Sequence, residues 1–286
     1  MVAKDSHNEL IIKSLQEDVG GGDITTRATI RSSYKGEARI ISKQEGILAG
    51  SVVCAHVFSS IDRDLKVKIS CFDGNPIKPN DTVILIAGSI GSIVTAERTA
   101  LNYLAHLSGV ATLTAQFVKQ IKGTRAKITD TRKTLPFLRA LEKEAVKAGG
   151  GYNHRMGLYD MILIKENHIT AVGGIVRAVE QTQRFLDKMG LDTNIEVETR
   201  SLDDVREALA CPVTRIMLDN MTLDEMRQAV KLINHQVEVE ASGNVNLENV
   251  REIALCGVDY ISVGAITHSA PAFDFSLIVN EVNRAE

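Results

Sequence analysis

The sequence predicts an α/β protein with two kinds of sheet, one antiparallel and one parallel. Residues from about 35 to 87 form short β-like runs separated by glycine- and proline-containing turns. After Gly123 the pattern changes, and short apolar strands alternate with amphipathic helices. This alternation indicates a parallel sheet, because each helix returns the chain to the start of the next strand. About six such units favour an α/β barrel over an open sheet.

The first part of the chain is expected to begin with a helix. Ser6 and Glu9 have capping-box spacing, and the three glycines at 20–22 end the apolar helical pattern that follows. Antiparallel strands are expected over 38–42, 65–70 and 82–87. A helical segment follows over about 92–122, and Gly109 is expected to divide it into two helices.

In the second part, strands and helices are expected to alternate. Strands are expected over 126–129, 161–164, 194–198, 215–218, 236–240 and 260–263. Helices are expected over 135–147, 174–189, 201–210, 223–233 and 247–255.

Composition excludes several classes of protein. Asp and Glu number 36 against 33 Lys and Arg, which argues against a dedicated nucleic-acid binder. No apolar run approaches the roughly 20 residues that cross a bilayer, and the first ten residues lack a signal-peptide core. The four cysteines are scattered without a CxxC pair, so we expect reduced thiols in a cytoplasmic protein.

Charged residues follow the expected parallel strands. Arg132 and Lys133 follow the first strand and Lys165 the second, whereas Glu198 and Asp219 end the third and fourth. The carboxyl ends of parallel strands share one rim, where active sites are built. Side chains remote in sequence are therefore expected to converge there, as a receptor for a small, multiply charged anion.

Each candidate cation also has a simpler explanation. Lys165 is a candidate Schiff-base lysine or phosphate ligand, or a structural partner of internal glutamates. Arg132 and Lys133 could clamp a carboxylate or phosphate, or lie in a solvated loop. His154 and Arg155 follow a flexible glycine run, which could bring them to a ligand or leave them on the surface.

Two expected strands, 195–198 and 237–240, alternate aliphatic residues with glutamates. If the aliphatic face packs under the helices, the glutamates point into the barrel and need cationic partners there. Lys127 and Lys165 are the candidate partners. The alternative is an exposed strand face with solvated glutamates.

Seven segments together carry a family resemblance. They are ERTALN (97–102), TRKT (131–134), GYNHR (151–155), LIKENH (163–168), EVE (196–198), LDN (218–220) and VGAITHS (263–269). In this order they resemble the nicotinate-nucleotide pyrophosphorylase (carboxylating) family of type II phosphoribosyltransferases, also called quinolinate phosphoribosyltransferases. The resemblance spans nearly the whole chain, which makes it far more specific than any single motif.

The resemblance implies a fold, an assembly and a reaction. The fold would be an N-terminal α/β sandwich over 1–108, to which 271–286 returns, and an atypical α/β barrel over 109–270. The assembly would be a homodimer in which Arg98 completes the site of the neighbouring subunit. The reaction would join quinolinate and phosphoribosyl pyrophosphate to give nicotinate mononucleotide, pyrophosphate and CO2, with Mg²⁺ required.

The resemblance also implies roles for the charged residues. Arg132, His154 and Arg155 would hold the two quinolinate carboxylates, joined by Arg98 from the partner subunit. Lys133 and Lys165 would face the phosphate groups, with Lys165 between both substrates.

The remaining roles concern the sugar and its phosphate. Glu198 and Asp219 would bind the ribose hydroxyls and Mg²⁺ and, with Lys165, make up the catalytic set. The segments Ser242-Gly243-Asn244 and Val263-Gly264-Ala265 would cradle the 5′-phosphate, and glycine loops after the last barrel strands suit that task. Asn244 departs from the glycine expected there, which bears on the geometry of phosphate binding.

Three other functions compete with this one. A paralogue could act on a different aromatic acid, because Arg and His clusters recognise carboxylates generically. A lyase barrel could use Lys165 as a Schiff base. A third possibility is a protein that binds a phosphorylated ligand without turnover, although the intact Lys165, Glu198 and Asp219 argue against it.

Overall fold

The computed structural model describes residues 2–283 and divides into two compact units. The first comprises Met1–Ala115, Leu135–Gly150 and Ala270–Glu286, and the second Gln116–Thr134 and Gly151–Ser269. These units differ from the predicted ranges 1–108 and 109–270, because residues 135–150 belong to the first. Helix α5 (Arg139–Ala148) is held there by a hydrogen bond of 2.7 Å between His106 Nε2 and Glu142 Oε1.

The sheet of the first unit has four antiparallel strands in the order β12-β1-β5-β3. Their bounds are Phe275–Asn283, Lys35–Ser42, Thr82–Ser89 and Lys66–Ile69. The antiparallel sheet predicted from residues 35–87 is confirmed, and the C-terminal strand β12 adds its outer edge along β1. A two-stranded ladder joins β2 (Gly46–Ile47) to β4 (Pro76–Ile77).

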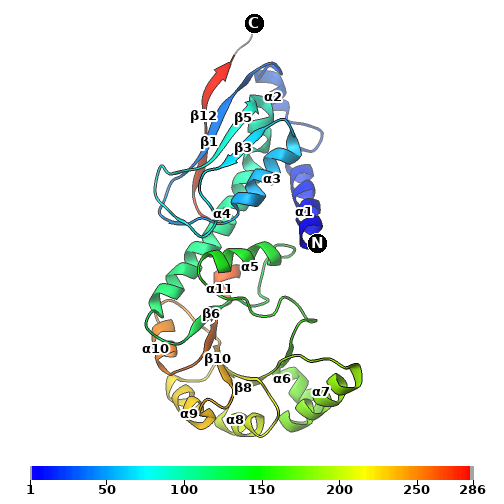
Figure 1. The fold of residues 1–286 in the computed structure, drawn as a ribbon, viewed down its shortest axis with the longest axis vertical. Coiled ribbons are helices and arrows are strands. Elements are labelled where there is room, and N and C mark those ends of the chain that lie inside the picture. The colour runs from blue at the N-terminus through cyan, green and yellow to red at the C-terminus, as the bar shows by residue number, and fades with distance from the viewer. Residues whose placement is uncertain (1, 284–286) are drawn as a thin grey trace. The chain divides into compact units, whose positions relative to one another are not determined.

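Helices α1 (Val2–Val19), α3 (Ser51–Ile61) and α4 (Ile90–Gln120) gather on one side of this sheet (Figure 1), which makes an α/β sandwich. The prediction that Ser6 begins the first helix is wrong, since α1 begins at Val2. The helix ends before Gly20, whose φ of +52° suits a glycine. The short helix α2 (Ile24–Thr29) begins at Asp23, whose carboxylate accepts the Thr26 N–H, and was not predicted.

The prediction that Gly109 interrupts a helix is wrong, because α4 is continuous through it. A Cβ on residue 109 would lie 2.1 Å from the carbonyl oxygen of Pro271. The glycine therefore lets the returning C-terminal segment pack directly against the helix. It does not break the helix, because other turns of α4 supply long apolar side chains to the core.

The second unit is built on six parallel strands in the order β6-β11-β10-β9-β8-β7. Their bounds, in chain order from β6 to β11, are Lys127–Thr129, Ile162–Ile164, Ile195–Thr199, Arg215–Asp219, Glu238–Ser242 and Tyr260–Ser262. All six predicted strands are confirmed within a few residues. No ladder joins β6 to β7 within residues 2–283, so the barrel is open between them.

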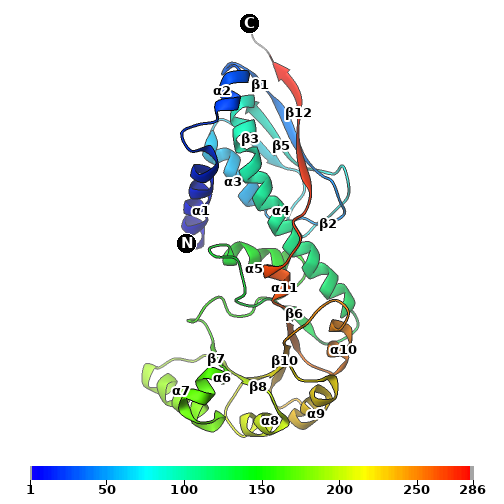
Figure 2. The same ribbon diagram turned by 180° about the vertical axis from the view of Figure 1, so that it is seen from behind.

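Helices cover the outside of this curved sheet (Figure 2). Those between strands are α6 (Glu166–Val172), α7 (Ile175–Met189), α8 (Leu202–Leu209), α9 (Leu223–Ile233) and α10 (Val250–Leu255), and α11 (Ala265–His268) follows the last strand. Capping boxes begin α8 and α9, where the hydroxyls of Ser201 and Thr222 accept N–H groups of the first turn. None of the described helices is long and apolar enough to cross a membrane.

Candidate active site

A cavity of about 330 Å³ lies at the carboxyl ends of the parallel strands in the second unit. Eight predicted site residues line it: Arg132, Lys133, His154, Arg155, Lys165, Glu198, Asp219 and Ser242. Five further residues complete the lining: Thr131, Leu163, Met217, Glu240 and Ser262. The predicted convergence of residues from different strand ends on one rim is therefore confirmed.

The loop after β6 carries two of the cations. Its backbone is fixed at Lys133, whose N–H donates to the Thr131 hydroxyl at 2.9 Å and whose carbonyl accepts from the Thr267 hydroxyl at 2.7 Å. Lys165 follows β7, and its Nζ lies 3.9 Å from Oε2 of Glu198. The side chain of Lys165 is half exposed, so a ligand in the cavity can reach it.

Two carboxylates, Glu198 and Asp219, lie at the ends of the neighbouring strands β8 and β9. Sequence analysis missed their cationic neighbour Arg200, which lies 4.0 Å from Glu198 and 3.5 Å from Asp219. Arg200 also pairs with Glu166 at 2.5 Å. Its position directly after β8 was the signal that could have identified it, since the other charged residues of the site also follow strand ends.

Of the four glutamates predicted to point into the barrel, Glu196 and Glu240 are fully buried there. Glu198 lines the cavity, whereas the prediction is wrong for Glu238, which is exposed. Of the predicted cationic partners, Lys165 does pair with Glu198, but neither Lys165 nor Lys127 is the partner of the buried Glu196 and Glu240. Instead, Nε2 of His154 lies 3.1 Å from Glu196 and 3.5 Å from Glu240. Strand β9, which runs between the two glutamate strands, places a second cation, Arg215, 3.0 Å from Glu240.

Lys127 begins β6, where its side chain is exposed. Its ammonium lies 5.1 Å from the ring centroid of Tyr152 and 5.3 Å from that of Tyr260, within range of a cation–π interaction. Lys127 lies in the same register row as Glu240, but Tyr260 of β11 stands between them, and the ammonium packs over its ring.

The buried cluster retains a proton at neutral pH. Burial opposes the charge on His154, but its hydrogen bonds with Glu196 and Glu240 raise its pKa to about 9. Burial and the nearby Glu240 carboxylate raise the pKa of Glu196. The Arg155 N–H donates to Nδ1 of His154 at 2.8 Å, which requires that nitrogen to be unprotonated. The geometry therefore places the additional proton on the Glu196 side of the pair rather than on Nδ1.

The two arginines of the cavity oppose each other's positive charge. Burial and the nearby Arg132 guanidinium lower the pKa of Arg155. The Nη1 of Arg155 donates to the Met161 carbonyl at 3.1 Å, which fixes one edge of its guanidinium. Two guanidiniums this close repel each other, and a ligand with two negative charges would relieve that repulsion.

Of the predicted phosphate loops, only Ser242 lines the cavity. Gly243 has a φ of +98°, and a Cβ there would lie 2.2 Å from Oδ1 of Asn220. Asn244, where a glycine was expected, also has a positive φ of 51°, and its amide donates to Asn220 at 3.0 Å. Asparagine tolerates this conformation better than other side chains, so the loop can keep its turn without the glycine.

The other predicted loop lies after β11. Val263 is buried, Gly264 precedes α11 and Ala265 begins it, and none of the three is among the residues that line the cavity. Arg98 belongs to the other compact unit. It lies on α4, where its side chain is exposed.

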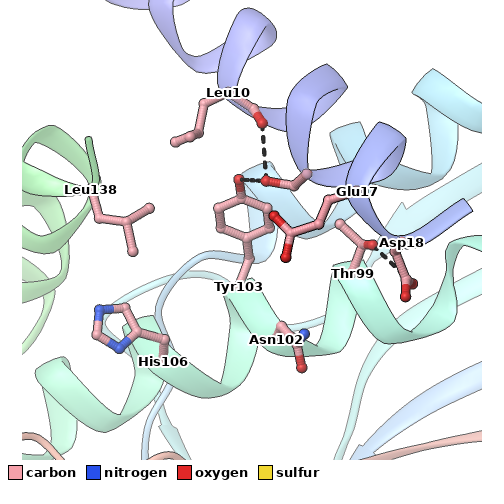
Figure 3. A pocket seen from close by; sticks show the side chains of 9 residues that line it. Leu10, Glu17, Asp18, Thr99, Asn102, Tyr103, His106 and Leu138 are labelled. Atoms are coloured by element: carbon pink, nitrogen blue, oxygen red, sulfur yellow. Dashed lines mark hydrogen bonds between the residues drawn. The ribbon is translucent and has the colours of Figure 1, made fainter. Parts of the chain in front are cut away.

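A larger cavity, of about 420 Å³, lies in the first unit between α1 and α4 (Figure 3). The hydroxyls of Ser14 and Tyr103 meet across it at 2.7 Å, and Glu17 and Asp18 contribute its charge. None of the predicted site residues lines this cavity. Cavity size therefore does not identify the candidate active site. The convergence of oppositely charged side chains at the strand ends identifies it.

Family comparisons cover both parts of the chain. Residues 23–108 match the family described as "Quinolinate phosphoribosyl transferase, N-terminal domain", and residues 110–278 match its C-terminal domain. Quinolinate phosphoribosyltransferase [decarboxylating] 2b of Nicotiana tabacum is 41% identical over 95% of this chain and 82% of its own length. A probable nicotinate-nucleotide pyrophosphorylase [carboxylating] of Synechocystis is 42% identical over 92% of this chain and 89% of its own.

Solved structures resemble the whole chain as well. The nicotinate-nucleotide pyrophosphorylase of Francisella tularensis superimposes with a TM-score of 0.90 at 38% identity, covering 96% of each chain. NadC of Streptococcus pyogenes gives 0.91 at 38% identity, covering 97% of this chain and 96% of its own. Similarity at this level extends to both compact units and to the parallel strands that carry the cavity.

Proposed function

This chain belongs to the quinolinate phosphoribosyltransferase family, and we propose that it transfers a phosphoribosyl group to quinolinate with loss of CO2. The products would be nicotinate mononucleotide, pyrophosphate and CO2, a reaction of NAD biosynthesis. One observation carries the proposal beyond the family relationship. A single cavity is lined by four cations, Arg132, Lys133, Arg155 and Lys165, together with the acid pair Glu198 and Asp219.

Charge assigns the substrates to different parts of the cavity. Arg132 and Arg155 would bind the two carboxylates of quinolinate, since a guanidinium presents a fork that matches a carboxylate. Lys133 and Lys165 would bind the phosphate groups of phosphoribosyl pyrophosphate as point charges. The resemblance also assigns His154 to the carboxylates, but both of its ring nitrogens make hydrogen bonds within the protein.

The acid pair suits both the ribose and a metal ion. Glu198 and Asp219 offer carboxylate oxygens, the ligands that Mg²⁺ prefers, and one or two carboxylates together with substrate phosphates make up its usual site. Mg²⁺ bound there would neutralise charge on the departing pyrophosphate. Arg200 pairs with the same two carboxylates, so its side chain would have to move for Mg²⁺ to bind them.

The charges of the cavity residues suit the bonds that form and break in the proposed reaction. The pyridine nitrogen bonds to C1′ of the ribose as the bond from C1′ to the pyrophosphate oxygen breaks, and the electron pair leaves with pyrophosphate. Positive charge develops on the ribose, and the carboxylates of Glu198 and Asp219 would stabilise it. The ring nitrogen is then cationic, which supports the electron pair left on the adjacent carbon when CO2 departs. A proton from solvent replaces the lost carboxylate.

The assembly proposed is a homodimer in which Arg98 of one subunit contacts the quinolinate of the other. Its support is the exposure of Arg98 on α4 and its place in a motif shared with the family. We also place the protein in the cytoplasm, on the ground that its four cysteines are all free thiols.

A turnover assay tests the function directly. Purified protein is supplied with phosphoribosyl pyrophosphate, Mg²⁺ and either quinolinate or nicotinate, while pyrophosphate and CO2 are measured. Equal amounts of the two products from quinolinate and none from nicotinate are expected. Turnover of another aromatic acid in preference to quinolinate would identify a paralogue. Borohydride trapping of Lys165 with a carbonyl substrate, without need of phosphoribosyl pyrophosphate, would identify a lyase.

A further inference from the structure

Both ring nitrogens of His154 are engaged within the protein. Nδ1 accepts the N–H of Arg155 at 2.8 Å, and Nε2 lies 3.1 Å from Oε2 of Glu196. The same nitrogen is 3.5 Å from Oε2 of Glu240. The imidazole is only 6% exposed and both carboxylates are fully buried. A substrate carboxylate that bound to Nε2 would have to displace a buried carboxylate, which would then lose its hydrogen bond.

The two carboxylates are themselves held by the strands beneath them. Arg215 lies opposite Glu196 in the β8–β9 register, and its Nη1 is 3.0 Å from Glu240. Its other nitrogens pair with Glu238 at 2.8 Å, and its guanidinium lies 4.0 Å from the ring centroid of Tyr260. Glu196 and Glu240 are therefore held in the sheet, and their contacts with Nε2 orient the imidazole.

The same three groups, His154, Glu196 and Glu240, could be read as a metal site, because one ligand atom from each lies within 4.8 Å of the others. The hydrogen bonds contradict that reading. A metal on Nε2 would require the ring proton on Nδ1, where the Arg155 N–H already donates. The adjacent Arg215 guanidinium would also repel a cation.

The imidazole controls the backbone that carries Arg155. The N–H of His154 donates to Oδ1 of Asp130 at 2.9 Å, and the next N–H, that of Arg155, donates to the imidazole. The two successive peptides on either side of the His154 Cα are thus each held by a hydrogen bond. Beyond it, the guanidinium of Arg155 reaches the Met161 carbonyl at 3.1 Å. Losing the imidazole would free the Arg155 peptide to turn.

We infer that His154 is a positioning residue for Arg155, held in place by Glu196, Glu240 and Arg215, and not itself a ligand of the substrate carboxylates. The inference rests on the proposed function, in which Arg155 binds quinolinate. It replaces the role that the resemblance implied for His154, because the geometry leaves the ring nitrogens committed to the protein.

A double-mutant cycle tests the inference. The Michaelis constant for quinolinate and its dissociation constant by calorimetry are measured for the native protein, His154→Ala, Arg155→Ala and the double variant. His154→Ala is expected to raise both constants about tenfold, with the Michaelis constant for phosphoribosyl pyrophosphate changed less than about twofold. In the Arg155→Ala background, His154→Ala is expected to raise the two quinolinate constants by less than about twofold more, since His154 acts on the substrate only through Arg155.

A direct contact between His154 and quinolinate would give a different pattern. The losses from the two single changes would then multiply in the double variant, and that result would overturn the inference. Absence of quinolinate turnover by the native protein would instead overturn the proposed function, so the two failures are distinguishable.

A more conservative variant tests the same inference in case His154→Ala does not fold. Glu196→Gln changes one atom of the group that orients the imidazole, and it is expected to raise the Michaelis constant for quinolinate about threefold. In the Arg155→Ala background it should add nothing. Glu180→Gln, an exposed glutamate on α7 paired with Arg184, is the matched control and should leave the constant unchanged. An equal effect of Glu196→Gln in both backgrounds would also overturn the inference.

Discussion

At the scale of single residues, the buried cluster around His154 combines charge with geometry. Two buried carboxylates, one imidazole and Arg215 come close to neutrality only if one additional proton is retained. One oxygen of Glu196 and one of Glu240 lack a hydrogen-bond partner among the described residues, which raises the cost of leaving both carboxylates ionised. The retained proton therefore lowers the free energy of the folded state.

Because of this retained proton, the free energy of unfolding should depend on pH. Hydrogen bonds with Glu196 and Glu240 outweigh burial and raise the pKa of His154 from 6.5 to about 9. Because Nδ1 accepts an N–H, the proton belongs to the His154–Glu196 pair, and between these pH values the folded pair holds a proton that the unfolded chain has lost. Its contribution is fully present below about pH 6.5 and is lost as pH rises through about 9, and the free energy of unfolding should fall by roughly 1–3 kcal/mol. Urea unfolding at a series of pH values measures this.

Glu196→Gln is the control for the pH dependence. The amide removes one of the two buried negative charges, so the cluster no longer needs the additional proton. The decline in unfolding free energy over this range should therefore be shallower than in the native protein. Identical slopes for the two proteins would contradict the assignment of the proton to this cluster.

At the scale of elements, α4 is the helix for which the sequence prediction failed, because the helix is continuous through Gly109. Gly109 has a low helix propensity, about 1 kcal/mol below that of alanine, which is why an interruption was predicted. The helix continues because neighbouring turns bury apolar side chains such as Leu104 and Leu107. The glycine itself is needed for a packing reason. The backbone of Pro271 packs at residue 109 so closely that no Cβ fits there.

Gly109→Ala should therefore destabilise the protein despite the better helix propensity of alanine. Overpacking against a carbonyl group typically costs about 1–3 kcal/mol, and the propensity gain of about 1 kcal/mol offsets only part of it. Urea unfolding compares the variant with native protein. Gly21→Ala is the control, because no atom lies within 4 Å of its added Cβ and its φ is not positive. A Gly109→Ala protein as stable as the control would contradict the packing argument.

At the scale of the whole molecule, the proposed dimer determines which chain supplies Arg98. Arg98→Ala and Lys165→Ala variants are each expected to be nearly inactive. If Arg98 acts on the partner's site, mixed dimers of the two variants contain one intact site, and about a quarter of native activity should return after subunit exchange. Phosphoribosyl transfer by the mixture measures this.

The control for subunit exchange is Lys165→Ala mixed with the double variant Arg98→Ala, Lys165→Ala. No combination of these chains holds an intact site, so activity should stay at the level of the single variants. If the first mixture also fails to recover while exchange is demonstrated by mass, Arg98 does not act across the dimer.

The sequence by itself determined the α/β class, the six parallel strands and the residues at their ends. The physical reason is that strand periodicity is local and parallel strands share one direction, so Arg132, Lys165, Glu198 and Asp219 had to reach the same rim. The strand-end rule also placed Lys133 there.

Tertiary structure alone decided which charges meet inside the barrel and where the barrel stays open. The buried Glu196 lies 42 residues from its partner His154, and that contact depends on strand order and on a loop whose path no local pattern encodes. Lys127 had the right charge, but the strand order puts Tyr260 of β11 between it and Glu240. The missing ladder between β6 and β7 likewise depends on distant segments, because hydrogen bonding between strands is decided by the folded sheet and not by either strand alone.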